Sequence, residues 1–167
     1  YLDAVFYPLI YENPFTLKQE GWHYELENAD APLQYNGVVY NEMKGVYSSP
    51  DAWLEYYGKK LLFPDTTYRF ESGGLPSAIP QLTQEDFISF HTMYYSPENS
   101  YIYLYGDMDI AERLDWMDRE YLSRYDAQKI DSEVKDQIHF SKMARISKTY
   151  AVSEDEQHMS LRYAPSY

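Results

Sequence analysis

Glu42 is the residue whose surroundings most clearly raise a chemical question. It lies inside the apolar stretch VVYNEMKGVY, residues 38–47, which has the period of a helix. The apolar stripe of this helix consists of Val39, Met43 and Val46. Glu42 borders that stripe, so we expect its carboxylate to be half-buried. Burial of a carboxylate costs on the order of several kcal/mol unless a metal ion, another cation or hydrogen-bond donors compensate. Glu42 therefore needs a compensating partner of this kind, or else it is a surface carboxylate paired with a lysine such as Lys44.

The histidines do not supply a metal site by themselves. The chain has four of them, at His23, His91, His139 and His158. No two stand four residues apart, so the helical zinc motifs HExxH and HxxEH are both absent. His91 follows Phe90 in an amphipathic helix, and we interpret it as a core or boundary residue. His23 could approach a site, but no local residue identifies a partner for it.

Common nucleophile and phosphate motifs are also missing. The chain contains no cysteine, which excludes thiol chemistry, thiolate metal sites and a disulfide framework. There is no GxSxG. The loop SGGLP, residues 72–76, has no lysine of the kind that phosphate-binding loops carry, so its Gly-Gly pair predicts a tight turn.

Composition narrows the classes of partner. The 167 residues carry a formal net charge of −13, which argues against nucleic-acid binding, because that requires clustered lysine and arginine. No apolar run approaches the roughly 18 residues that a membrane span needs. The acidic balance fits a basic or neutral partner, or solubility alone. The 20 tyrosines fit a peptide-binding wall, and equally a half-hydrated sheet surface.

Capping signals predict three helices in the middle of the chain. Ser49 and Pro50 begin one that ends before Pro64. Thr83 with Asp86 forms a capping box for the second, and Asp109 opens the third. Their expected buried stripes are Leu54, Tyr57 and Leu61; Phe87, Phe90 and Tyr94; and Ile110, Leu114, Met117, Tyr121 and Tyr125.

Strands are expected between and after these helices. The stretch YIYLY, residues 101–105, alternates strictly, as a strand does. Strand character returns at residues 145–152 and 159–164, after a polar linker. The first residues form a short helix broken by Pro8. Helices and strands do not alternate regularly, so the predicted class is α+β, with helices packed on an antiparallel-rich sheet.

Three stretches carry a resemblance to a known family. They are QEGWHYEL (residues 19–26), GVVYNEMKGVYSSP (37–50) and LFPDTTYRFESGGLPSAIPQLTQEDFISFHTMYYSPENSYIYLYGDMD (62–109). Together they resemble the insulinase/pitrilysin family of inverted-zincin metallopeptidases, in particular its presequence-protease and falcilysin branch. The likeness runs over roughly residues 1–165.

The resemblance implies a role for Glu42. These enzymes hold Zn²⁺ with two histidines of an HxxEH helix and a glutamate from a second helix, and the glutamate of NEMKG matches that third ligand. The family places the HxxEH helix, with its general base, upstream of Tyr1. We therefore expect no catalytic residue within these 167 residues and no activity of this segment alone. Asn41 points about 100° away from Glu42 on the wheel and is expected to make a helix–helix contact.

The family also implies a domain arrangement. Residues 1–127 are expected to be the C-terminal half of a metallopeptidase-like α+β domain, residues 128–137 a linker, and residues 138–167 the first strands of the next, homologous domain. The expected partners are the remaining domains of the same parent chain and peptide substrates, for which the negative charge would suit basic ones. No nucleic acid or membrane partner is expected.

Two other interpretations stay open. A non-catalytic homologue would use the same fold as a scaffold or peptide-binding partner. An independent acidic binding module would present the tyrosines and fold cooperatively alone. For localisation we expect the cytoplasm, or the mitochondrial matrix or another organelle if the source is eukaryotic.

Overall fold

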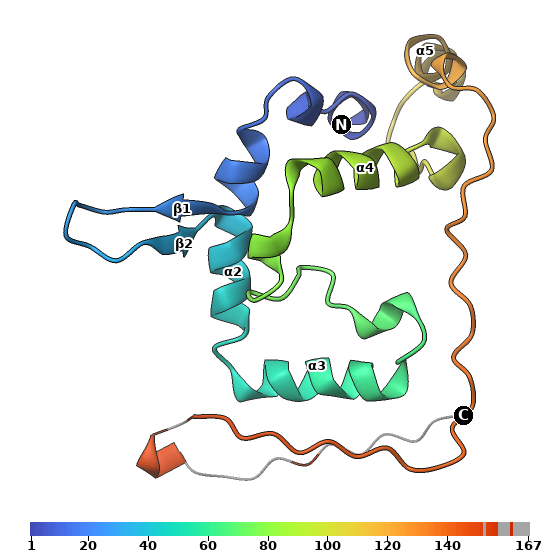
Figure 1. Cartoon of the computed structure of the whole chain (residues 1–167). Helices are drawn as coiled ribbons and strands as arrows, with labels where there is room; N and C mark the ends of the chain where they lie inside the picture. Colours follow the sequence, from blue (N-terminus) through green and yellow to red (C-terminus); the bar gives the residue numbers. More distant parts are fainter. Residues whose placement is uncertain (152, 157–160, 162–167) are drawn as a thin grey trace. The chain divides into compact units, whose positions relative to one another are not determined.

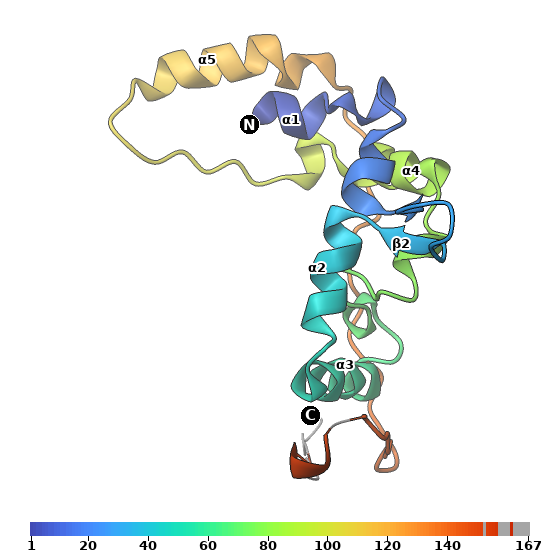
Figure 2. The ribbon, with the colours of Figure 1, turned by 90° about the vertical axis from the view of Figure 1, so that its left-hand side faces the viewer.

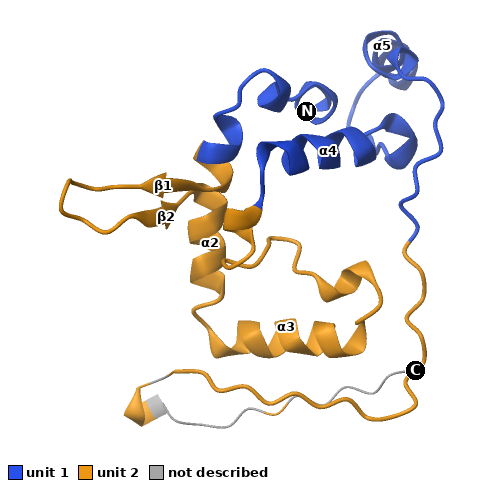
Figure 3. Ribbon diagram, viewed as in Figure 1, with its two compact units in different colours: residues 1–18, 82–133 blue, residues 19–81, 134–167 orange. Residues whose placement is uncertain are grey.

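The computed structural model describes residues 1–151, 153–156 and 161. The chain has α+β structure, and its described residues form helices and one antiparallel pair of strands (Figure 1). It divides into two compact units, residues 1–18 with 82–133 and residues 19–81 with 134–167 (Figure 3). Within the described residues, no helix combines the length and the apolar character that crossing a membrane requires.

The first unit is helical in its described elements. These are α1 (Leu2–Phe6), η1 (Leu9–Tyr11), α4 (Gln84–Tyr94), η5 (Pro97–Asn99), α5 (Ile110–Glu120) and η6 (Leu122–Arg124). The predicted starts are confirmed. Thr83 and Asp86 exchange hydrogen bonds at the start of α4, and the Asp109 side chain accepts one from the Glu112 amide at the start of α5. As predicted, α1 ends before Pro8.

Aromatic rings hold α1 in the first unit. Phe6 is buried, with ring centroids 5.6 Å from Tyr125 and 6.5 Å from Tyr121. The Tyr125 hydroxyl also donates to the Phe6 carbonyl at 3.3 Å. Of the stripe predicted for α5, Met117 is buried, whereas Ile110 is exposed.

The buried stripe predicted for α4 is wrong at Phe90, which is 60% exposed. Helix α4 meets the N-terminal segment with a different face. The Gln84 amide donates to the Ile10 carbonyl at 3.2 Å, and His91 bonds both Val5 and Tyr11. These polar contacts determine which face of α4 is covered. The spacing of apolar residues, on which the prediction rested, gives no information about them.

The strand predicted at residues 101–105 is also wrong. This stretch is extended but belongs to no sheet among the described residues (Figure 2). Tyr101, Tyr103 and Tyr105 are all more than 80% exposed. A strand needs a partner for its backbone groups, and the described residues offer none.

The second unit joins a hairpin to two helices. In chain order it has β1 (His23–Glu25), β2 (Gln34–Asn36), α2 (Val38–Val46), α3 (Pro50–Leu62), η3 (Thr67–Arg69), η4 (Ile79–Gln81) and η7 (Glu154–Glu156), and the π-turn η2 (Leu17–Gly21) leads into it. The strands pair antiparallel, with Tyr24 opposite Tyr35. The predicted cap of α3 is confirmed, since Ser49 Oγ accepts from the Asp51 amide at 3.2 Å.

The core of the second unit lies between α2, α3 and the loop that follows α3. Its buried residues are Met43, Tyr47, Tyr56 and Ile79. The stripe predicted for α3 is only partly buried, because Tyr56 provides the central contact. The helix ends before Pro64, as predicted.

Residues 134–151 make side-chain contacts with the segments that precede and follow α3. Gln137 and Asp65 exchange two hydrogen bonds, and the Tyr150 hydroxyl donates to the Ser48 carbonyl. The strand predicted at 145–152 is absent from its described residues, 145–151, which lack a backbone partner there. The strand predicted at 159–164 lies outside the described residues, apart from Leu161. The boundaries of the predicted domains, 1–127, 128–137 and 138–167, stay a prediction.

Candidate functional site

Glu42 stands on α2, and the hairpin determines where that helix begins. A single residue, Gly37, separates β2 from α2, and its φ of 149° is a conformation that favours glycine. A Cβ at Gly37 would come within 2.7 Å of the Trp22 Cα. The close approach of the two segments therefore requires glycine at this position, and it ties the start of α2 to the first strand.

Helix α2 has two apolar faces. Met43 and Tyr47 are buried, with Tyr40 partly buried beside them. Val38 and Val46 lie outside this face and are 56% and 47% exposed. Glu42 lies between these valines on the wheel, one turn from each.

The expectation of a half-buried Glu42 is wrong for this chain, where its side chain is exposed. The cause is the choice of face. Of the stripe predicted from spacing only Met43 is buried, because Tyr40 and Tyr47 pack beside it in place of Val39 and Val46. Glu42 thus sits in an apolar surface that nothing in the described chain covers.

The loop SGGLP, residues 72–76, packs against the buried side of the same helix. Gly73 lies directly against the Met43 side chain, and a Cβ there would come within 2.9 Å of Met43 Cε. Gly74 has a φ of 85° and turns the loop so that Ile79 reaches the core. The predicted tight turn at Gly-Gly is confirmed. It packs against the buried face of α2, whereas Glu42 lies outside that face.

Within the described residues, the Glu42 carboxylate has neither a hydrogen bond nor an ion pair. The predicted alternative, an ion pair with Lys44, does not form there. A helix–helix contact was expected of Asn41, but the hydrogen bond of its side-chain amide in the described chain goes to Asn36 Oδ1 of β2, at 2.6 Å. An accessible, unpaired carboxylate remains available to a cation.

The described residues contain no group of three or more histidine, cysteine, aspartate or glutamate side chains that could hold a metal ion. His23 lies on β1, and His139 is exposed in the coil that follows residue 126. His91 is partly buried, with its ring nitrogens 2.8 Å from the Val5 carbonyl and 2.7 Å from the Tyr11 hydroxyl. It is a boundary residue, as predicted. His158 lies outside the described residues.

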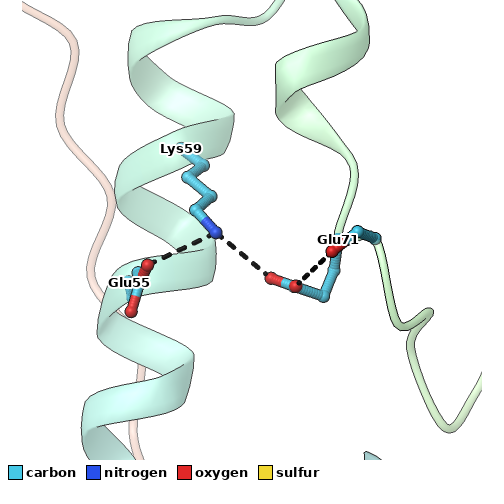
Figure 4. A network of polar contacts seen from close by, with 4 residues as sticks. Glu55, Lys59 and Glu71 are labelled. Atoms are coloured by element: carbon cyan, nitrogen blue, oxygen red, sulfur yellow. Dashed lines mark hydrogen bonds and ion pairs between the residues drawn. The ribbon is translucent and has the colours of Figure 1, made fainter. Parts of the chain in front are cut away.

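A second polar cluster, which the sequence analysis missed, lies beyond the buried side of α2. Lys59 reaches Glu55 at 3.3 Å on its own helix and Glu71 at 3.4 Å from the loop (Figure 4). Its hydrogen bond to Glu55 is the main cause of a raised Lys59 pKa. Lys59 and Glu71 also line an open pocket of about 300 Å³ with Tyr68 and Phe70. The Glu55–Lys59 spacing is readable in the sequence, whereas the link to Glu71 depends on the loop.

Comparison with known proteins relates the chain to one protein family. A family profile described as "Peptidase M16 inactive domain" matches residues 81–163. Protein HypA of Clostridium perfringens is 51% identical over 156 residues, which is 93% of this chain and 16% of that protein. Presequence protease 1, chloroplastic/mitochondrial, of Arabidopsis thaliana is 45% identical over 157 residues, 93% of this chain and 14% of that protein. The mitochondrial presequence protease of Danio rerio is 39% identical over 145 residues, 85% of this chain and 14% of that protein.

The chain therefore belongs to the insulinase (M16) peptidase family, and it is similar to presequence proteases over most of its length. It spans 14–16% of the length of these three relatives. The profile match begins after Glu42. The residues around α2 are therefore related to the family through the three relatives above, which match 85–93% of the chain.

Proposed function

We propose that the chain is part of a zinc-dependent metalloendopeptidase that degrades short unstructured peptides, and that Glu42 is one ligand of its Zn²⁺. The two histidine ligands and the general base would come from an HxxEH helix elsewhere in the polypeptide. This segment would then be inactive by itself.

The observation that carries the proposal is the position of Glu42. Its carboxylate is exposed, unpaired among the described residues and flanked by Val38 and Val46. An exposed apolar surface indicates a contact with other protein. A glutamate at the centre of such a contact would be desolvated, and it needs a cation there. A metal ion held jointly with a second helix meets both requirements.

The residues of this chain would contribute positioning and one anionic oxygen. Met43 and Tyr47 anchor α2 from behind, with Gly73 against Met43, so Glu42 projects from a supported helix. Zn²⁺, when bound, supplies Lewis-acid activation of water and of a peptide carbonyl. Three protein ligands with one open position are typical of catalytic zinc, and Glu42 would fill one of the three.

One observation favours a second candidate, a non-catalytic homologue acting as a scaffold or peptide-binding partner. The profile that matches residues 81–163 is described as an inactive domain. The sequence that precedes Tyr1 in the full-length protein separates the two candidates. An HxxEH motif supports the peptidase, and a polypeptide without one supports the scaffold.

The names of two relatives bear on localisation. Two of the relatives described above carry "mitochondrial" or "chloroplastic/mitochondrial" in their names, which supports the organelle alternative. The cytoplasmic expectation gains no support from these names. Peptides, basic ones in particular, and the other domains of the same polypeptide remain the proposed partners.

The test is the substitution Glu42→Gln in the full-length protein. We expect bound zinc and peptidase activity to fall together, since an amide oxygen is a poor substitute for a carboxylate on zinc. Glu85→Gln is the matched control, because Glu85 is an exposed glutamate of another helix. Zinc content by elemental analysis is the primary measurement. An E42Q protein that keeps full zinc occupancy would remove Glu42 from this role.

A further inference from the structure

The β1–β2 hairpin exposes an aromatic face. Side chains alternate along a strand, so Tyr24 on β1 and Trp22, which directly precedes β1, lie on one face and meet Tyr35 of β2. The Tyr24 and Tyr35 rings stack 5.2 Å apart, and Trp22 meets Tyr24 edge-on at 5.5 Å. The other face is polar, with a hydrogen bond of 2.7 Å from the Asn36 amide to Glu25.

This face is open to solvent although it is apolar. Tyr24 is 58% exposed and Tyr35 is 43% exposed. Leu26 and Leu33, next to the paired residues, are 54% and 61% exposed. The turn of the hairpin points away from α2 (Figure 1). Exposed apolar residues that gather in this way mark an interaction surface.

The charged residues of the hairpin itself are of one sign. Residues 19–36 contain no lysine or arginine, and all their acidic residues are exposed: Glu20, Glu25, Glu27 and Asp30. A partner with positive charge would therefore be favoured, and one with negative charge would be repelled.

Tyrosine rings elsewhere in the same unit already bind cations. Lys60 lies 5.1 Å from the centroid of Tyr56, and Lys148 lies 5.5 Å from that of Tyr57. In the described part of the chain, no cation stands over Tyr24 or Tyr35. Their ring faces can accept a lysine or arginine of another molecule.

We propose that the aromatic face of the β1–β2 hairpin binds basic amphipathic peptide segments, with apolar side chains on Tyr24, Tyr35 and Leu33 and cationic ones near Glu27 and Asp30. The inference rests on the proposed function in taking this peptide to be a substrate. It goes beyond that function in placing a recognition surface outside the metal site.

The test measures the dissociation constant of a fluorescent leucine–lysine amphipathic peptide with the full-length protein. A chelator is present, so cleavage does not contribute. The double substitution Tyr24→Ser with Tyr35→Ser is expected to weaken binding about tenfold, since each ring loses a stacking or cation contact. Gln34→Ala, on the opposite face of β2, is the matched control and should stay within about twofold, as surface changes away from a contact usually do.

A second variant tests the charge. Glu27→Gln with Asp30→Asn is expected to weaken binding about threefold and to reduce its salt dependence. A peptide with glutamate in place of each lysine should bind the unmodified protein far more weakly. Equal affinity for the two peptides would overturn the proposal, as would an unchanged dissociation constant in the tyrosine variant.

Other occupants of the face give distinct results. If the rest of the polypeptide covers it, the tyrosine variant will lose thermal stability and keep its affinity, which also overturns the proposal. Failure of the proposed function would appear separately, as unchanged zinc content in E42Q. Binding in the presence of a chelator does not depend on that result.

Discussion

Gly73 and Met43 are in direct contact across the core of the second unit. A Cβ at residue 73 would approach Met43 Cε to 2.9 Å, closer than carbon atoms normally come. Met43 follows Glu42 on α2. The packing of the Met43 side chain against the loop therefore affects the position of Glu42, the candidate ligand. The Gly-Gly pair therefore acts on the site through packing.

Replacing Gly73 with alanine in the full-length protein is expected to destabilise it by about 1–2 kcal/mol, because the added methyl group overpacks the core. Urea unfolding measures the loss. Gly73→Ala combined with Met43→Ala should cost less than the sum of the two single changes, since the truncated side chain makes room for the methyl group. Additive effects would contradict the contact.

Gly45 gives the opposite test, on the exposed side of α2. A Cβ at Gly45 would meet nothing within 4 Å among the described residues. In a helix with a free surface, Gly45→Ala should raise stability by about 0.5–1 kcal/mol. If a second helix approaches there to complete the metal site, the same change should lower both the melting temperature and the zinc content of the full-length protein. A rise in melting temperature with unchanged zinc would argue against that approach.

The helix starts could be predicted because their causes are local. Ser49, Thr83 and Asp109 each bond an amide two or three residues later, so the sequence contains the whole interaction. The position of Glu42 on a helix followed from the same short-range periodicity. The α+β class followed from the irregular order of helices and strands.

Choice of face and strand pairing could not be predicted, because both depend on distant partners. Spacing in α2 predicted a stripe of Val39, Met43 and Val46. The helix instead packs Met43 and Tyr47 against Tyr56 and Ile79. Residues 101–105 alternate as a strand does, but pairing is a property of two segments. The prediction that Glu42 is half-buried was wrong for the same reason, because it depended on which face of α2 is packed.

The capping box of α4 should make that helix sensitive to acid. Hydrogen bonds from the Thr83 hydroxyl and then from its backbone amide hold the pKa of Asp86 below its usual value. A lowered pKa in the folded state stabilises the fold above the usual value, about 4 for aspartate, and this contribution is lost as the pH falls through the folded pKa. The protection factors of the amides in residues 84–94, which are ratios of the intrinsic exchange rate at each pH to the observed rate, should therefore fall at acid pH. Asp86→Asn should weaken this pH dependence, whereas Glu85→Gln should leave it unchanged. An equal weakening in both variants would contradict the role assigned to Asp86.

Tyr47 should make the second unit sensitive to alkali. Burial, followed by the nearby charge of Glu71, raises the pKa of Tyr47 to about 12 from an ordinary value of 10.0. The raised pKa means that the neutral hydroxyl stabilises the folded state below about pH 10, and that this contribution disappears as the pH rises toward 12. A shift of this size corresponds to about 2–3 kcal/mol. Tyr47→Phe should move alkaline unfolding, followed by circular dichroism, to higher pH, because phenylalanine fills the same space without ionising. Tyr103→Phe, at an exposed tyrosine, is the control, and equal shifts in the two variants would show that the ionisation of Tyr47 does not govern the transition.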